Sequence, residues 1–361
     1  MKKINLITST LLLSSTFAFG ADSIDTAFKE GKVSGSLNLY TENYDHKTTT
    51  DSGFNSGDIE LSYETGNFMG LSGKVGFVGA HEFSEKENGD ADILASKALM
   101  SEANLTYAIN GASLTVGRQA VSLEWMGDYH EAAIATITAV QDTTIVLAYS
   151  DKVAVAGFDE MSEKFEKFNG KKGAYVVDVK YTGLAGIELN PYYYTLPDTA
   201  DSYGLKATYS ADMFGAVAHY ATADVDGNSD DDSIVHLEGN VSVASLSLAL
   251  GYIKTDKDAG ADDIGAGDDN ISPFEEGNYV YDVDAKTMYG SIGYEIVGIN
   301  LGLLYGETKY GATDDKEKEL NLMVDYSFTD SLSASALYAD INAENSANDY
   351  NKFLASVTYS F

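Results

Sequence analysis

The side chains best suited to chemistry lie together in one short segment, on either side of the chain's single tryptophan. They are Arg118, Glu124, Asp128, His130 and Glu131. A guanidinium opposite carboxylates in a narrow passage creates a transverse field, and an excess of carboxylates there favours cations. The more ordinary interpretation is that such charges are solvated on a surface loop. The elements that carry the segment decide between these two interpretations.

Catalysis has weaker support in the residue spacing. A Ser-His-Asp or metal constellation needs groups that converge, but the histidines fall in separate segments: His46, His81, His130, His219 and His236. The chain has no Cys, which excludes disulfides, thiol chemistry and Cys-ligated metal. We therefore expect no enzyme activity, no cofactor and no tightly bound metal.

A second candidate is an acidic run with an oxygen-bearing side chain at every other position. Its members are Asp224, Asp226, Asn228, Asp230 and Asp232. Calcium loops show such alternation, but the EF-hand pattern fails because Gly227 is fourth and Val235 twelfth. A solvated external loop is the favoured interpretation, and weak binding of divalent cations remains the alternative.

The end of the chain indicates which elements position these residues. Phe353, Val357, Tyr359 and Phe361 alternate with polar residues such as Ser356 and Thr358. Strands with lipid on one face and water on the other have this period of two. A closing strand that ends in Tyr359-x-Phe361 also resembles the signal read by the outer-membrane assembly machinery, which is therefore an expected partner.

Strand-like segments of this kind recur along the whole chain, which has 25 Tyr and 34 Gly but only 3 Pro. We predict eighteen strands, with sixteen as the alternative because some segments, such as 131–139, are weak. The predicted ranges are 32–42, 56–65, 70–83, 99–109, 111–119, 131–139, 143–150, 172–182, 185–195, 202–210, 213–222, 233–242, 244–254, 285–296, 298–309, 318–328, 331–340 and 350–361.

Short and long connections alternate between these strands. A Greek-key sandwich has no reason to keep that alternation, whereas an up-and-down transmembrane barrel has short periplasmic turns and long external loops. The predicted fold is therefore an all-β, antiparallel, up-and-down transmembrane barrel. Both chain ends then lie on the periplasmic side, which requires an even number of strands.

The N-terminus predicts export. Lys2 and Lys3 precede an apolar stretch, and Ala18-Phe19-Gly20 resembles a cleavage site. We predict a signal peptide at 1–20 and one barrel domain at 21–361. A formal net charge of −33 argues against nucleic acid as a partner. The expected location is the outer membrane of a Gram-negative bacterium, in contact with its lipids.

Two segments resemble the OprD-type, campylobacter-type major outer membrane porins. Segment 25–35 (DTAFKEGKVSG) resembles the N-terminal helix and first strand of that family, and 114–119 (LTVGRQ) resembles the strand before its inward-folding third loop. With the terminal Phe361, the resemblance spans essentially the whole mature chain. It implies a pore narrowed by the third loop, passive diffusion of small hydrophilic solutes and ions, and a homotrimer.

Segment 120–130 follows the third upward strand, so we predict that it folds into the lumen. Trp125 and Met126 would pin it to the inner wall, while Glu124, Asp128 and Glu131 would meet Arg118 and His130 at the constriction. The chain departs from the family it resembles because Arg118 is its only arginine, whereas those carboxylate channels carry a ladder of basic residues. We therefore predict a cation-preferring general porin. The alternatives are a substrate-selective outer-membrane channel and a β-rich surface adhesin.

Overall fold

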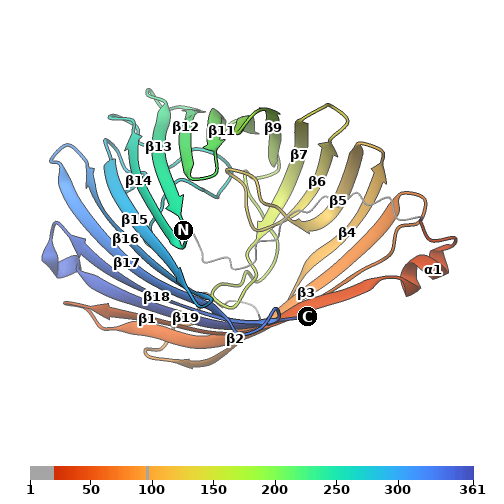
Figure 1. The fold of residues 1–361 in the computed structure, drawn as a ribbon, viewed down its shortest axis with the longest axis horizontal. Helices are drawn as coiled ribbons and strands as arrows, with labels where there is room; N and C mark the ends of the chain where they lie inside the picture. The colour runs from red at the N-terminus through yellow and green to blue at the C-terminus, as the bar shows by residue number, and fades with distance from the viewer. Residues whose placement is uncertain (1–19, 95–96) are drawn as a thin grey trace.

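The computed structural model describes residues 20–94 and 97–361, and these form a closed antiparallel β-barrel (Figure 1). It has eighteen long strands and one extra two-residue strand, β8. The elements are α1(Ile24–Lys29), β1(Lys32–His46), β2(Ser52–Glu64), β3(Leu71–Glu85), β4(Leu99–Ile109), β5(Ala112–Ala120), β6(Tyr129–Ile137), β7(Thr143–Ala154), β8(Glu166–Lys167), β9(Ala174–Leu184), β10(Ile187–Leu196), β11(Ala200–Ser210), β12(Phe214–Val225), β13(Asp232–Val243), β14(Leu246–Thr255), β15(Lys286–Ile296), β16(Ile299–Tyr310), β17(Asp315–Ser327), β18(Leu332–Ala343), η1(Ser346–Asn348) and β19(Tyr350–Ser360).

The alternation of side chains along each strand decides which face is which. On β1, Leu37 and Leu39 are exposed on the outer wall, whereas Asn38 between them is buried on the inner side. Leu39 lies directly opposite Val357 of β19 in the closing pair. An apolar exterior around a polar interior is the arrangement of a barrel that stands in lipid.

The predicted barrel is confirmed, with eighteen membrane-length strands rather than sixteen. Strand β4 has the predicted bounds, and most other strands differ from their predicted ranges by a few residues at the end next to a long loop. Strand β8 was not expected, because two residues within a loop carry no periodicity. The predicted signal peptide lies outside the described residues except for Gly20.

Pro191 sits within β10, where a residue without an N–H cannot complete the pairing. The register between β9 and β10 shifts between Ile187 and Leu189, so a bulge lies beside the proline. The side-chain amide of Asn190 donates to the carbonyl of Val179 over 2.9 Å, which supplies a contact between the two strands at this irregularity.

Short turns join the strands at the end of the barrel where both described chain ends lie. Between β15 and β16, Val297 and Gly298 alone make the connection, with φ angles of 51° and 77°. Two successive positive φ angles are typical of the tight turns that match the twist of a hairpin. The opposite end of the barrel carries the long loops.

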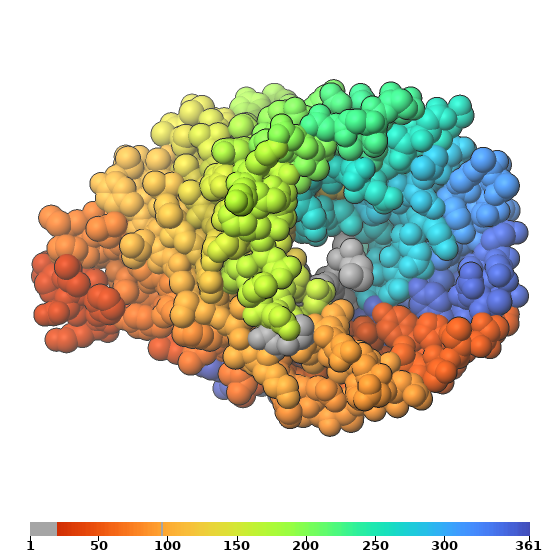
Figure 2. Space-filling model, turned by 180° about the vertical axis from the view of Figure 1, so that it is seen from behind, coloured from red at the N-terminus to blue at the C-terminus, as the bar shows by residue number. Residues whose placement is uncertain are grey.

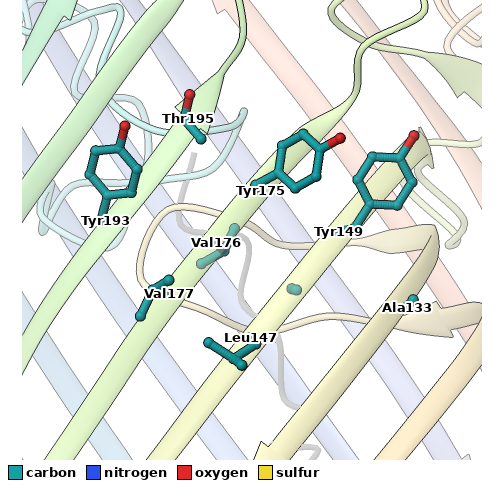
Figure 3. Close-up of a pocket in the computed structure, with 9 residues that line it drawn as sticks. Ala133, Leu147, Tyr149, Tyr175, Val176, Val177, Tyr193 and Thr195 are labelled. Carbon is teal, nitrogen blue, oxygen red and sulfur yellow. The ribbon is translucent and has the colours of Figure 1, made fainter.

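Tyrosines gather on the outer wall near the long-loop end. Figure 3 shows the rings of Tyr149, Tyr175 and Tyr193 above the aliphatic side chains of Val177 and Leu147, around a shallow depression. The rings of Tyr149 and Tyr175 are 5.0 Å apart. Amphipathic rings favour the boundary between lipid and water, so this group marks the expected upper edge of the lipid-facing band.

Candidate functional site

Three long loops turn inward instead of extending away from the barrel. They are loop 121–128 between β5 and β6, loop 155–173 between β7 and β9, and loop 256–285 between β14 and β15. Each has side chains buried against inward-facing residues of the wall. The lumen is therefore narrowed from several directions.

Loop 121–128 is a compact hairpin. The N–H of Val121 donates to Asp128 O and that of Leu123 to Met126 O, each over 2.8 Å. At its tip, Trp125 and Met126 are 1% and 0% exposed, within an apolar cluster that includes inward residues of β9 to β16. The N–H of Trp125 also donates to Tyr194 Oη over 3.3 Å. The tip is thus attached to the wall opposite its own strands.

Glu124, at the same tip, does not meet Arg118 as the sequence suggested. Its carboxylate accepts two bonds from Lys206 Nζ of β11, over 2.8 and 2.9 Å. His219 Nδ1 of β12 lies 3.7 Å from the same carboxylate. The reason is the reach of the hairpin, which carries Glu124 away from β5 and toward β11 and β12.

Arg118 and Glu131 do come together. They are direct cross-strand partners, with Arg118 Nε 2.9 Å from Glu131 Oε1. Lys152 of β7 lies opposite Glu131 on the other neighbouring strand, and its Nζ is 2.5 Å from Glu131 Oε2. The guanidinium lies 4.4 Å from the ring of Phe165, a residue of loop 155–173. Two cations therefore share one carboxylate beneath that loop.

His130 and Asp128 lie at the base of the hairpin and stabilise it. The ring of His130 is fully buried, its Nε2 donates to Gly127 O over 2.6 Å, and its Nδ1 accepts from the hydroxyl of Ser150 over 2.8 Å. These bonds fix a neutral tautomer and leave neither ring nitrogen for solute. Asp128 has a φ of 66°, and its carboxylate lies near that of Asp268 in loop 256–285.

Loop 155–173 crosses the mouth to the wall formed by the first strands. The ring of Phe158 packs 4.9 Å from that of Tyr40, and the hydroxyl of Ser56 donates to Phe158 O. Met161 is buried on Val78 and Ala80 of β3. Figure 2 shows the yellow-green segment spanning the mouth down to the orange wall, with an opening beside it.

Loop 256–285 packs on loop 121–128 and continues beyond it. The N–H of Ala266 donates to Trp125 O, and the amide of Asn270 donates to Glu124 O, each over 2.9 Å. Farther along, Glu275 contacts Lys352 of β19 over 3.1 Å. Burial raises the pKa of the Glu275 carboxyl above its ordinary value, and Lys352 opposes that shift.

On the wall next to loop 155–173, two inward carboxylates of β2 have no basic side chain within ion-pair distance among the described residues. Asp58 is 4% exposed and accepts a bond from the amide of Asn38 over 2.5 Å. Glu60 is the next inward residue along the strand. By contrast, Lys74 of β3 is paired with Glu102 over 2.8 Å.

The acidic run 224–232 does not assemble into a metal site. Asp232 instead accepts from the N–H of Asp263 over 2.9 Å, at the base of loop 256–285. Within residues 20–94 and 97–361, no three His, Asp or Glu side chains lie close enough together to hold a metal ion. In the same part of the chain, no helix is both long and apolar enough to cross a bilayer.

Three functional groups were missed from the sequence: Lys152, Lys206 and Lys352. The sequence did offer one signal for them. Each is a basic residue in or just after a predicted strand, at a position whose side chain faces into the barrel. What the sequence lacked was any indication of which carboxylate would reach each lysine.

Comparisons with known proteins agree with this geometry. The sequence model of the Gram-negative porin family matches residues 8–346. Among solved structures, Acinetobacter baumannii OccAB4 aligns with a TM-score of 0.73 at 17% identity, covering 92% of this chain and 98% of that one. Pseudomonas aeruginosa OccK3 (OpdO) aligns at 0.78 and 15%, covering 93% and 97%. P. aeruginosa OpdK, solved with vanillate, aligns at 0.76 and 13%, covering 92% and 99%. A search of curated protein sequences found no significant match.

The pair between Glu124 and Lys206 generates a prediction about the hairpin. Lys206→Ala leaves a nearly buried carboxylate without its partner, which should destabilise the tip by about 1–3 kcal/mol, less than for a fully buried pair. Because Trp125 is the only tryptophan, its fluorescence reports directly on the tip. Emission should shift to longer wavelength in Lys206→Ala.

The charge-swapped variant Glu124→Lys with Lys206→Glu should restore the native emission. Lys180→Ala on the nearby strand β9 is the matched control and should leave the emission unchanged. An unshifted spectrum in Lys206→Ala would mean that apolar packing alone holds the tip.

Proposed function

The chain belongs to the Gram-negative porin family, and we propose that it is an OprD-type general diffusion porin that prefers cations. As a member of that family it is an outer-membrane channel for small solutes and not an enzyme. The finer features proposed here are the OprD type, the passive and unselective uptake, the ion preference, the assembly signal and the trimer.

The observation that carries the ion preference is how the charges along the inward loops are paired. Arg118, Lys206, Lys286 and Lys352 are wall cations that contact these loops, and each lies within ion-pair distance of a carboxylate. Glu60, which is half-buried, faces the same lumen without such a partner among the described residues, beside the nearly fully buried Asp58. An unneutralised carboxylate in a confined, low-dielectric mouth raises the local concentration of cations.

The same pairing argues against selective uptake of anions. A ladder of basic side chains can pass anionic solutes along a pore only if those side chains are free to exchange partners. Here the guanidinium of Arg118 is held by Glu131 and by the ring of Phe165. OpdK has been solved with vanillate. Selective uptake of such an anion by this chain would require free basic side chains in the lumen, whereas this chain keeps them paired. A surface adhesin is not supported, because three loops are used to fill the lumen.

Ion selectivity tests the proposal directly. In a planar bilayer with a KCl gradient, the zero-current potential should indicate cation preference. The double change Asp58→Asn with Glu60→Gln should lower the ratio of cation to anion permeability by up to about fivefold, since the two screened charges together contribute ~1 kcal/mol or less.

The control carries the same change of charge outside the lumen: Asp230→Asn with Asp231→Asn, in the exposed loop after β12. It should leave the potential within error of the wild type. Anion selectivity of the unmodified channel would contradict the proposal.

The topology generates a second test. The chain has no Cys, so single substitutions can be labelled cleanly. Ser229→Cys and Asn345→Cys, in exposed long loops, should react with a membrane-impermeant maleimide on intact cells. Asn110→Cys and Ala211→Cys, in short turns at the opposite end, should react only after the outer membrane is permeabilised. Equal labelling of all four on intact cells would exclude this orientation.

The closing strand generates a third test, on assembly. Phe361 exchanges two backbone hydrogen bonds of 3.0 Å with Gly35 across the seam, and its ring lies 6.2 Å from that of Tyr359. Phe361→Ser keeps the backbone bonds and removes the ring. If Tyr359 and Phe361 are the assembly signal, this variant should accumulate in the periplasm, with less heat-modifiable barrel in the membrane. Insertion at the wild-type level would leave Phe361 with only a role in the seam.

A further inference from the structure

Loop 256–285 is attached at both ends to one side of the barrel and at its tip to another. Its base is closed by a bond of 2.7 Å from the N–H of Asp284 to Asp256 O, beside β14 and β15. Its tip, 275–278, contacts β17, β19 and, through Lys352, Glu42 of β1. The loop therefore runs inside the barrel from β14 and β15 to β19 and β1 as a strap.

Lys352 lies at the centre of the contact between the tip and β19. Its side chain is 5% exposed and its Nζ is 2.7 Å from Glu276, 3.1 Å from Glu275 and 3.5 Å from Glu42. The ring of Tyr44 lies 5.1 Å from the same nitrogen. A desolvated ammonium is stable only with such partners, and two of the three carboxylates come from the strap.

The wall of β17 is also arranged to receive the tip. The N–H groups of Glu276 and Gly277 both donate to the carboxylate of Glu319, over 3.0 and 2.9 Å. The amide of Asn278 donates to Glu317 over 3.1 Å and to Tyr350 Oη over 3.0 Å. These specific polar contacts hold the tip, while apolar packing and separate hydrogen bonds, such as those to loop 121–128, hold the rest of the strap.

The charges at this contact are unbalanced. Carboxylates come from the wall and from the tip: Glu42, Glu317 and Glu319 from the wall, Glu275 and Glu276 from the tip. Among the described residues, Lys352 is the one basic side chain within ion-pair distance of any of them. Without it, tip and wall would present only like charges to each other, which repel at this range.

We propose that Lys352 is the positioning residue that holds loop 256–285 across the lumen, so that it sets the width of the pore. The proposal rests on the proposed function, because a width matters only in a channel. On either side of the tip, Ile264, Ile271 and Val280 pack in the main apolar cluster. Loss of Lys352 should therefore release the tip and leave the rest of the loop in place.

The position of the strap can be measured without any transport. Nitroxide labels at Pro273→Cys, beside the tip and not part of the contacts described above, and at Ser346→Cys on a fixed external turn should give one narrow distance distribution in the otherwise wild-type barrel. In Lys352→Met that single peak should be lost in favour of a broad distribution. Lys352→Arg, which keeps the charge, should restore the narrow peak.

Single-channel recording tests the consequence. Lys352→Met should show a higher mean conductance and additional current levels as the tip moves. Lys74→Met is the matched control, because Lys74 is a lysine of β3 whose ion pair is with Glu102 of the wall; it should keep the wild-type current levels. If Lys352→Met does not fold, Glu275→Gln with Glu276→Gln breaks the same contact from the strap and should give the same broad distribution.

The outcomes separate the two proposals. A narrow, unchanged distance together with unchanged current in Lys352→Met would overturn the positioning role. Equal conductance changes in Lys352→Met and Lys74→Met would also overturn it, since the effect would then be one of charge alone. Absence of conductance in the wild type would refute the proposed function, while the distance measurement would still decide whether Lys352 holds the strap.

Discussion

Closure of the sheet between β1 and β19 is the constraint on which the rest of this structure depends. In hydrocarbon no water can satisfy a backbone N–H or C=O, so an open edge strand cannot persist there. The register that closes the ring runs from Ser36 opposite Ser360 to His46 opposite Tyr350. Once the ring is closed, every strand has a fixed inner face, and the inner faces together determine where an inward loop can attach.

The interior is organised by paired charges rather than by a continuous apolar core. The hairpin 121–128 is held at Lys206, the base of loop 155–173 lies over Arg118, and loop 256–285 ends at Lys352. Each contact joins a loop to the wall through a basic side chain of that wall. The apolar cluster around Trp125 adds non-directional adhesion, and the directional contacts of these basic side chains fix the position of each loop.

The strands could be predicted because their signal is local. A period of two is visible within a few residues, and Leu246, Leu248 and Leu250 show it as clearly in the sequence as on the outer wall. The inward turn of segment 120–130 and the burial of Trp125 and Met126 followed from the order of the loops. The partner of Glu124 could not be predicted, because Lys206 is distant in the chain and only the closed ring brings it near. Lys352 was missed for the same reason, since two of its three carboxylates come from a loop that begins and ends at other strands.

The division between loops that fold inward and loops that point outward limits where the chain can change in length. Residues added to segment 226–231, or around η1, would extend into open solvent, where a longer loop costs little entropy. Residues added to 121–128 or to the tip 275–278 would have to fit inside a ring of fixed circumference. Related chains are therefore expected to differ in size at the cell surface while their inward loops keep nearly constant lengths. Tags, epitopes and other inserted sequences are best placed at the outward loops for the same reason.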